Sequence, residues 1–419
     1  MEQGRRAEIE IQYEGKDITT PINEDLEQYT YTDVASGESD SISISLKNDH
    51  KKWMDEWMPN KGDRMSGTIV LRDWDAPGAE NSLYCGEFEV DDMTFSGRPL
   101  SCEIGAVSIP RNEPFNSQNR TKTWESITIQ QIAQEIAGRA KVSLYYEAED
   151  IPVEIIEQNE QTDCKFLYAL CSDYGLAMKV YANKIIIFDE ETYEKRASVR
   201  TIDETDMVKW NYKSTVAGTY TGANLRYTDP NDSEEYHIII GGGNRILEIN
   251  ENTDNIKDAE RKGIAKLNNE NKKAITMSIT IKTDVKIFST SCIDVTGLGS
   301  KINGKYYVDK VITKKSGSGT CQSTLETHRI IPRIKTVSIG AVEQAEESST
   351  AAGTSYTVVS GDTLWSIAKS LYGNGMEYEK IYTANKDTIE ETAKQRGKED
   401  SSNGHWLFSG TTLTIPPKE

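Results

Sequence analysis

The side chains that could act as nucleophiles or metal ligands are few and lie far apart in this sequence. The four histidines occur singly, at His50, His237, His328 and His405. A serine or cysteine nucleophile needs a base beside it, and neither a GxSxG turn nor an HExxH zinc motif is present. The six cysteines form no CxxC pair, which favours small buried hydrophobic residues over a disulfide or metal framework. We therefore predict no catalytic residue, no metal and no cofactor, and expect that the protein is not an enzyme.

Carboxylates are the one abundant reactive group. The chain has 67 acidic and 48 basic side chains, and its formal net charge is -19. Two carboxylates brought close together can cleave a glycosidic bond, so hydrolysis of a polysaccharide remains an alternative chemistry. A solvated acidic surface explains the excess more simply, and its repulsion of phosphates argues against stable nucleic-acid binding. The glycines at 241–243 are followed by no lysine-serine pattern, so we interpret them as a turn between strands.

The elements that must position these groups change character twice along the chain. Residues 1–118 alternate between apolar and polar residues, as in Ser41–Leu46, which predicts a β domain. In residues 119–200, apolar residues occur at helical spacing. A capping box at Thr128 and Gln131 predicts the start of a helix, and Gly138 is expected after its end. This segment therefore predicts a small α+β domain. Strand patterns return in 201–335, interrupted by one charged helix.

An internal echo links the two β segments. The sequence Gly86–Asp91 (GEFEVD) recurs as Gly304–Asp309 (GKYYVD). In both copies a glycine-containing turn, a cysteine and a Pro-Arg pair follow in the same order, namely Cys102 with Pro110 and Arg111, and Cys321 with Pro332 and Arg333. We predict two related β domains flanking the α+β domain. The alternative is a chance likeness between two hairpin ends.

The sequence YTVVSGDTLWSIA at Tyr356–Ala368, followed by Asn385 and a closing LTIP, resembles a LysM module. A strand, a helix capped near Thr363, a second helix around Glu377–Asn385 and a final strand at Thr412–Ile415 agree with the βααβ order of that family. LysM modules bind N-acetylglucosamine polymers such as peptidoglycan, so the alternative function is a peptidoglycan hydrolase that LysM targets to the cell wall. We expect Trp365 to be buried, because it lies on a helix, and we expect an additional helical turn or two at Thr388–Gly397.

The LysM resemblance also implies a glycan site. Its floor would be the loop after the first strand and the segment before the last one. Exposed backbone amides and side-chain oxygens there can bind an acetamido group, while an apolar wall accepts its methyl group. The candidate residues are Ser360, Gly361, Asp362, Thr363, Leu364 and Asn385.

Motifs in the first 335 residues resemble the phage late control protein D family of tail hub proteins. They are Trp53–Trp57, Gly86–Asp91, Trp124 with Glu125, Ile129–Ala137 and Gln161–Gly175. Hubs of contractile phage tails, R-type bacteriocins and type VI secretion spikes share this architecture. The resemblance implies a homotrimer that links the sixfold tail tube above to a separate spike protein below, and that contacts other baseplate proteins.

The sequence thus predicts a mainly β protein with α+β parts: two related hub β-barrel domains flank a small α+β domain, and a tethered βααβ LysM module follows. The expected boundaries are 1–118, 119–200, 201–335, a flexible linker at 336–354, and LysM at 355–419. No signal peptide or membrane span is evident. We expect a structural baseplate hub of a contractile phage tail or tail-like bacteriocin, located in the virion or particle baseplate and assembled in the bacterial cytoplasm. Its LysM domain would dock to baseplate proteins or peptidoglycan.

Overall fold

The computed structural model describes residues 4–108, 113–216, 219–228, 235–250, 253, 255–341, 354–359 and 361–416. The chain divides into two compact units, Met1–Val342 and Glu343–Glu419. In the described ranges, no helix is long and apolar enough to cross a membrane.

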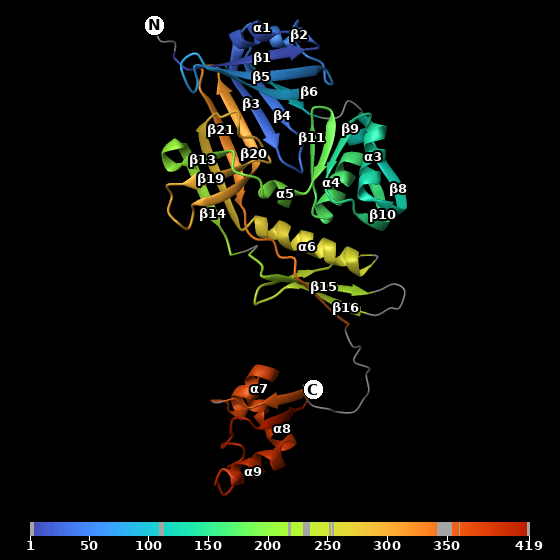
Figure 1. The fold of residues 1–419 in the computed structure, drawn as a ribbon, viewed down its shortest axis with the longest axis vertical. Coiled ribbons are helices and arrows are strands. Elements are labelled where there is room, and N and C mark those ends of the chain that lie inside the picture. The colour runs from blue at the N-terminus through green and yellow to red at the C-terminus, as the bar shows by residue number, and fades with distance from the viewer. Residues whose placement is uncertain are drawn as a thin grey trace. The chain divides into compact units, whose positions relative to one another are not determined.

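The first unit is organised around a 13-stranded sheet (Figure 1). Strands from both predicted β domains belong to this sheet, because β3 pairs with β20. The path runs β14-β18-β21-β20-β3-β4-β7-β6-β5-β1-β2, with β19 paired to β20 and β13 paired to β19. The strands are β1 (Arg6–Tyr13), β2 (Lys16–Asp17), β3 (Leu26–Val34), β4 (Ser41–Lys47), β5 (Arg64–Arg72), β6 (Glu80–Ser96), β7 (Ser101–Val107), β13 (Arg200–Asp203), β14 (Met207–Ser214), β18 (Ile275–Lys282), β19 (Cys292–Thr296), β20 (Gly304–Ser316) and β21 (Cys321–Arg329).

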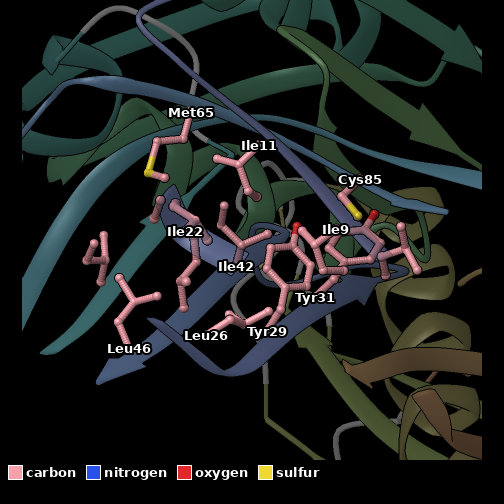
Figure 2. Packing of buried hydrophobic residues seen from close by; sticks show 14 of the residues in the cluster. Ile9, Ile11, Ile22, Leu26, Tyr29, Tyr31, Ile42, Leu46, Met65 and Cys85 are labelled. Atoms are coloured by element: carbon pink, nitrogen blue, oxygen red, sulfur yellow. The ribbon is translucent and has the colours of Figure 1, made fainter. Parts of the chain in front are cut away.

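Alternation along the strands gives this sheet one buried face. In β4, Ile42, Ile44 and Leu46 are buried, while the serines between them are partly exposed. Together with Tyr29 and Tyr31 of β3 they belong to the main hydrophobic cluster (Figure 2). Each such buried aliphatic side chain contributes roughly 1.5–3 kcal/mol to folding. The short helices α1 (Thr19–Asp25) and η1 (Lys52–Met54) add one buried residue each.

The predicted α+β module forms a separate core within the first unit. Thr128 and Gln131 make the predicted capping box at the start of α3, but this helix continues past Gly138 to Ala140, and Lys141 takes the left-handed cap. Ala140 is buried, so packing extends the helix beyond the glycine. The elements are α2 (Glu113–Ser117), β8 (Asn119–Thr128), α3 (Ile129–Ala140), β9 (Ser143–Glu147), β10 (Pro152–Thr162), α4 (Asp163–Asp173), β11 (Ala177–Tyr181), β12 (Lys184–Phe188) and α5 (Glu190–Glu194).

Helix α6 (Ile256–Lys272) covers one face of a four-stranded sheet, three of whose strands lie between β14 and β18 in the sequence, while the fourth follows β21 (Figure 1). Its strands are β15 (Gly222–Thr228), β16 (Glu235–Gly241), β17 (Ile246–Ile249) and β22 (Val337–Ala341). The last strand corrects the predicted linker at 336–354, because Val337–Ala341 pair with β16. Five alternating residues are too few to predict a strand. The partner strand is also distant in the sequence, so no local pattern indicates the pairing.

The second unit is the predicted βααβ module with one addition. Strands β23 (Thr354–Thr357) and β24 (Thr412–Ile415) pair antiparallel. Helix α7 (Leu364–Tyr372) is capped by Thr363 and stops at Gly373, whose φ is 78°. It is followed by η3 (Gly375–Glu377), α8 (Tyr378–Ala384) and α9 (Lys386–Gln395). Helix α9 is the predicted additional helical segment, and it begins at Lys386.

Candidate functional site

The two β segments repeat the same arrangement of five strands. The first copy runs β3-β4-β7-β6-β5, and the second runs β14-β18-β21-β20-β19, with antiparallel pairing throughout both. When the strand registers of the two copies are aligned, Ile44 of β4 corresponds to Ile279 of β18. Ile44 pairs with Ile104, and Ile279 pairs with the counterpart of Ile104, which is Leu325.

Two irregularities recur at equivalent positions. The β6–β7 register shifts around Asp91, and the β20–β21 register shifts around Asp309. A second shift falls between Leu26 and Gln28 in β3, and between Met207 and Lys209 in β14. A bulge adds one residue and changes the local twist, so chance rarely places two of them alike in two sheets. The repeated order and the repeated bulges support two related halves.

The register also corrects one part of the predicted parallel. Cys102 pairs with Phe95, whose counterpart in the second half is Thr313. Thr313 pairs with Ser323, so Ser323, and not Cys321, corresponds to Cys102. The β20–β21 hairpin is one residue pair longer than the β6–β7 hairpin, so Cys321 corresponds to a turn position in the first copy. Pro110 and Arg111 lie outside the described residues.

The two halves are joined edge to edge inside the chain. Strand β3 pairs antiparallel with the second part of β20, from Lys310 opposite Val34 to Ser316 opposite Gln28. The two large aromatic side chains of β3, Tyr29 and Tyr31, are buried in the hydrophobic cluster of the first half, which also contains Ile9 and Ile11 of β1. The equivalent residues on β14 are Trp210 and Tyr212, by their pairing with β18.

A buried ionic cluster holds the α+β module against both halves. The ammonium group of Lys179 on β11 contacts the carboxylate of Asp33 on β3, and it lies 3.2 Å from Asp40 and 2.9 Å from the Ser289 hydroxyl. The backbone N–H of Ser289 donates to Asp33 at 2.7 Å. Burial raises the pKa of Asp40 to about 7, while the charge of Lys179 opposes that shift and the charge of Asp33 adds to it.

A second buried cluster surrounds His328 on β21. Its ring contacts Asp309 of β20 at 2.8 Å and Glu194 of α5 at 3.3 Å. Arg333 donates to Glu194 at 2.7 Å and to Glu190 at 3.1 Å. Burial opposes protonation of His328, but the charge of Asp309 and the hydrogen bonds to Asp309 and Glu194 outweigh it and raise the histidine pKa to about 9. Every charged group of this cluster is paired, which fits a structural role.

The candidate glycan residues of the second unit are largely engaged in its fold. The Asp362 carboxylate accepts hydrogen bonds from the Tyr356 hydroxyl at 2.8 Å and from the Val359 N–H at 3.0 Å. Thr363 caps α7, and Leu364 is buried in the core. Gly361 is exposed and has a φ of 97°. Ser360 lies outside the described residues.

Asn385 lies in the core of the module and joins α8 to the final strand. Its amide nitrogen donates to the carbonyls of Ile381 at 2.8 Å and Thr414 at 2.6 Å, and its amide oxygen accepts from the Thr414 N–H at 2.6 Å. The side chain is therefore fully occupied within the fold.

The expected burial of Trp365 is wrong. Its side chain is 49% exposed, with Lys369 over the ring at 4.9 Å. Trp365 lies at the border of the buried face of α7, where Leu364, Ile367 and Ala368 already fill the core. Met376 is also highly exposed, so this unit presents apolar side chains that the sequence reasoning did not identify.

The structure shows no cluster of metal ligands within the described ranges. All six cysteines are free and buried, as expected for small hydrophobic residues. Burial raises the pKa of Cys171 and of Cys85, which keeps both thiols protonated at neutral pH.

Known proteins resemble both parts of the chain. The LysM domain family matches residues 356–391. The chain is 26% identical to the probable baseplate hub protein of Escherichia phage 186 over 223 residues, covering 52% of this chain and 55% of the relative. It is 25% identical to the probable baseplate hub protein of Escherichia phage P2 over 229 residues, covering 53% and 56%. The chain thus spans about half the length of the curated relatives it matches.

The fold also resembles a solved tail protein. The crystal structure of the tail protein from Neisseria meningitidis MC58 matches with a TM-score of 0.59 and 11% identity, covering 78% of this chain and 97% of that protein. At this identity the likeness concerns the fold. The chain is therefore homologous to phage baseplate hub proteins over about half of its length, its first unit has a fold like that of a tail protein, and its C-terminal part contains a LysM domain.

Proposed function

We propose that this protein is a structural baseplate hub of a contractile phage tail or tail-like bacteriocin. The observation that carries the proposal is the repeated five-strand sheet, with bulges at Asp91 and Asp309 in equivalent strands. Its role is to transmit load between parts of the tail, and this role requires no catalytic step. The relatives from phages 186 and P2 support this role.

The repeat gives the hub its symmetry. A chain with two similar halves presents six similar units when three copies form a ring. Such a homotrimer mates with a sixfold tail tube on one side and with a threefold spike protein on the other. Other baseplate proteins bind around it, and the particle is assembled in the bacterial cytoplasm.

The LysM domain docks this hub to neighbouring baseplate proteins or to peptidoglycan. Its exposed Trp365 and Met376 support a contact surface, because large apolar side chains are enriched in protein interfaces. Co-sedimentation with purified peptidoglycan, comparing the full chain with one ending at Ala341, tests the glycan role. Equal amounts of both chains in the pellet would contradict it.

The mass of the protein in solution tests the hub proposal. Light scattering should give three times the chain mass for the full protein and also for a chain ending at Ala341. A cut near Lys335 would remove strand β22 and disturb the sheet that contains β16, so the truncation must follow that strand. Monomers of both chains at all concentrations would contradict the trimer, and a zymogram on peptidoglycan would then test the hydrolase alternative.

A further inference from the structure

We propose that helix α6 and the four-stranded sheet it covers form an arm that pivots at the C-terminal end of α6 and opens away from the α+β module at the other end. The arm consists of β15, β16, β17, α6 and β22 (Figure 1). Its buried side chains, such as Leu225, Ile240 and Leu267, form a cluster separate from the core of the α+β module. The arm can therefore keep its own fold while its contact with the module changes. This movement goes beyond the proposed function and does not depend on it.

All three chain segments that link the arm to the main sheet meet at the C-terminal end of α6. The buried Asn271 donates to the carbonyl of Tyr220 at 2.9 Å and accepts from its N–H at 2.7 Å, in the segment after β14. The buried Asn268 makes the same pair of bonds to Ile334, in the segment after β21, both at 2.9 Å. The third segment leads directly from α6 into β18. The arm is thus attached to the main sheet at one end of its helix.

Buried ion pairs fix the same end of the arm to the α+β module. Lys272, the last residue of α6, contacts the carboxylate of Glu190 on α5. Arg333, which precedes β22, donates to Glu190 at 3.1 Å and to Glu194 at 2.7 Å. Both carboxylates are buried, so separating these pairs would leave uncompensated charges in the interior. This end is therefore the pivot.

The contact at the N-terminal end of α6 is weaker. Arg261 lies 3.4 Å from Glu149, whose side chain is 75% exposed. An exposed ion pair stabilises a contact little, and salt screens it. A cavity of about 800 Å³ lies at this end, lined by Ile256 of the arm and Pro152 of the module among others. The arm can open here without breaking a packed core.

Between the two ends, small residues form the contact. A Cβ atom on Gly175, which follows α4, would lie 3.3 Å from the Cβ of Ala265 on α6. Two further cavities, of about 570 and 200 Å³, are lined by α6 on one side and by Leu176 and other module residues on the opposite side. Interdigitated large side chains would resist a change of angle, but cavities flanking one small contact permit it.

The length of α6 amplifies a small rotation. Its 17 residues span about 25 Å, so a rotation of about 10° at the pivot moves the N-terminal end by about 4 Å. The last strand of the arm, β22, ends at Ala341, and the chain continues from there into the C-terminal unit. A pull on that connection therefore acts on the arm and favours the open position.

Distances between spin labels in the full chain test the pivot. Glu154→Cys and Lys257→Cys place labels at two exposed positions on opposite walls of the cavity of about 800 Å³. The control, Ser172→Cys with Lys273→Cys, uses exposed positions on opposite walls of the cavity of about 570 Å³ near the pivot. The six native cysteines are buried and should label slowly. An excess of unlabelled parent chain keeps each measured pair within one copy.

Salt should open the arm. We expect the distance between positions 154 and 257 to lengthen by about 4 Å or more when KCl rises from about 0.05 M to about 0.5 M, because salt screens the Arg261–Glu149 pair. Arg261→Gln should lengthen the same distance at low salt. The control distance should stay narrow and constant under all of these conditions.

Two outcomes would overturn the pivot. A narrow distance between positions 154 and 257 that neither salt nor Arg261→Gln changes would mean that α6 is fixed along its whole length. Equal lengthening of the control distance would mean that the arm detaches as a whole. Neither outcome bears on the hub proposal, which the mass of the protein in solution tests separately.

Discussion

The imidazole Nδ1 of His328 lies 2.8 Å from Oδ1 of Asp309, across the β20–β21 pair and beside the bulge that the two halves share. The ring is buried, and its pKa is raised to about 9. Because the folded pKa lies above the unfolded value of about 6.5, this group stabilises the fold fully below pH 6.5, and the contribution is lost as pH rises through 9.

His328→Gln should therefore be most destabilising at low pH. We expect a loss on the order of 2 kcal/mol in the free energy of unfolding at pH 6, shrinking towards pH 9.5. Urea unfolding of both proteins at one protein concentration measures the difference. His237→Gln, on the strand β16, serves as the control. A loss that stays constant with pH would contradict the ionised pair.

The cluster around Lys179 gives two variants with opposite expectations. Lys179→Met leaves two buried carboxylates, Asp33 and Asp40, without their cation, and should destabilise the protein by about 3 kcal/mol. Asp40→Asn keeps an oxygen that can accept from Val34 and Lys179, and removes one of the two acids. Its effect should be much smaller.

The Asp40 variant should also change the pH dependence. The pKa of Asp40 is raised to about 7, so its contribution to stability is present below its unfolded pKa near 3.9 and is lost as pH rises through 7. Asp40→Asn should gain stability relative to the parent between pH 4 and pH 8. Thermal unfolding across this range measures it, and a constant difference would contradict the shift.

Sequence reasoning identified the fold class because its signals were local. The capping box at Thr128 and Gln131, the helix cap at Thr363 and the alternation in β4 each depend on residues close together in the chain. The pairing of β3 with β20 and of β22 with β16 joins residues far apart, and no local pattern specifies such partners. The echo at Gly86 and Gly304 was the one sequence signal for the repeat.

Sequence reasoning was weaker for side-chain roles. Asn385 fits the family's pattern as a candidate glycan contact, but its amide holds α8 and β24 together. Residue type alone does not distinguish a polar group that binds a ligand from one that satisfies buried backbone, since both need the same donors and acceptors. For Trp365 the error concerned burial: a residue expected in the core lies at the border of the core, because a position on a helix does not distinguish the two.

Asn385→Ala tests this structural role. Removing the amide leaves the Thr414 N–H and the carbonyls of Ile381 and Thr414 without their partner, which should cost about 2 kcal/mol in the LysM unit. Hydrogen exchange of the full chain, read at β24 and α8, should show faster exchange there only. Unchanged protection, together with weaker binding to peptidoglycan, would instead favour a direct glycan contact.

The segment after α9 should depend on Glu390. Its carboxylate accepts from the Tyr382 hydroxyl at 2.6 Å and from the Ser401 N–H at 2.8 Å, and also contacts the Ser401 hydroxyl. The hydrogen bonds from Ser401, followed by that from Tyr382, lower the pKa of Glu390 to about 2. This carboxylate is therefore charged at any pH above 4.

Glu390→Ala should release residues 396–411, and limited proteolysis should cut the variant there faster than the parent. Glu391→Ala, at the exposed neighbouring position, should be cut at the parental rate. Equal rates for both variants would mean that the buried Ile389 and Ala393 hold this segment without the carboxylate.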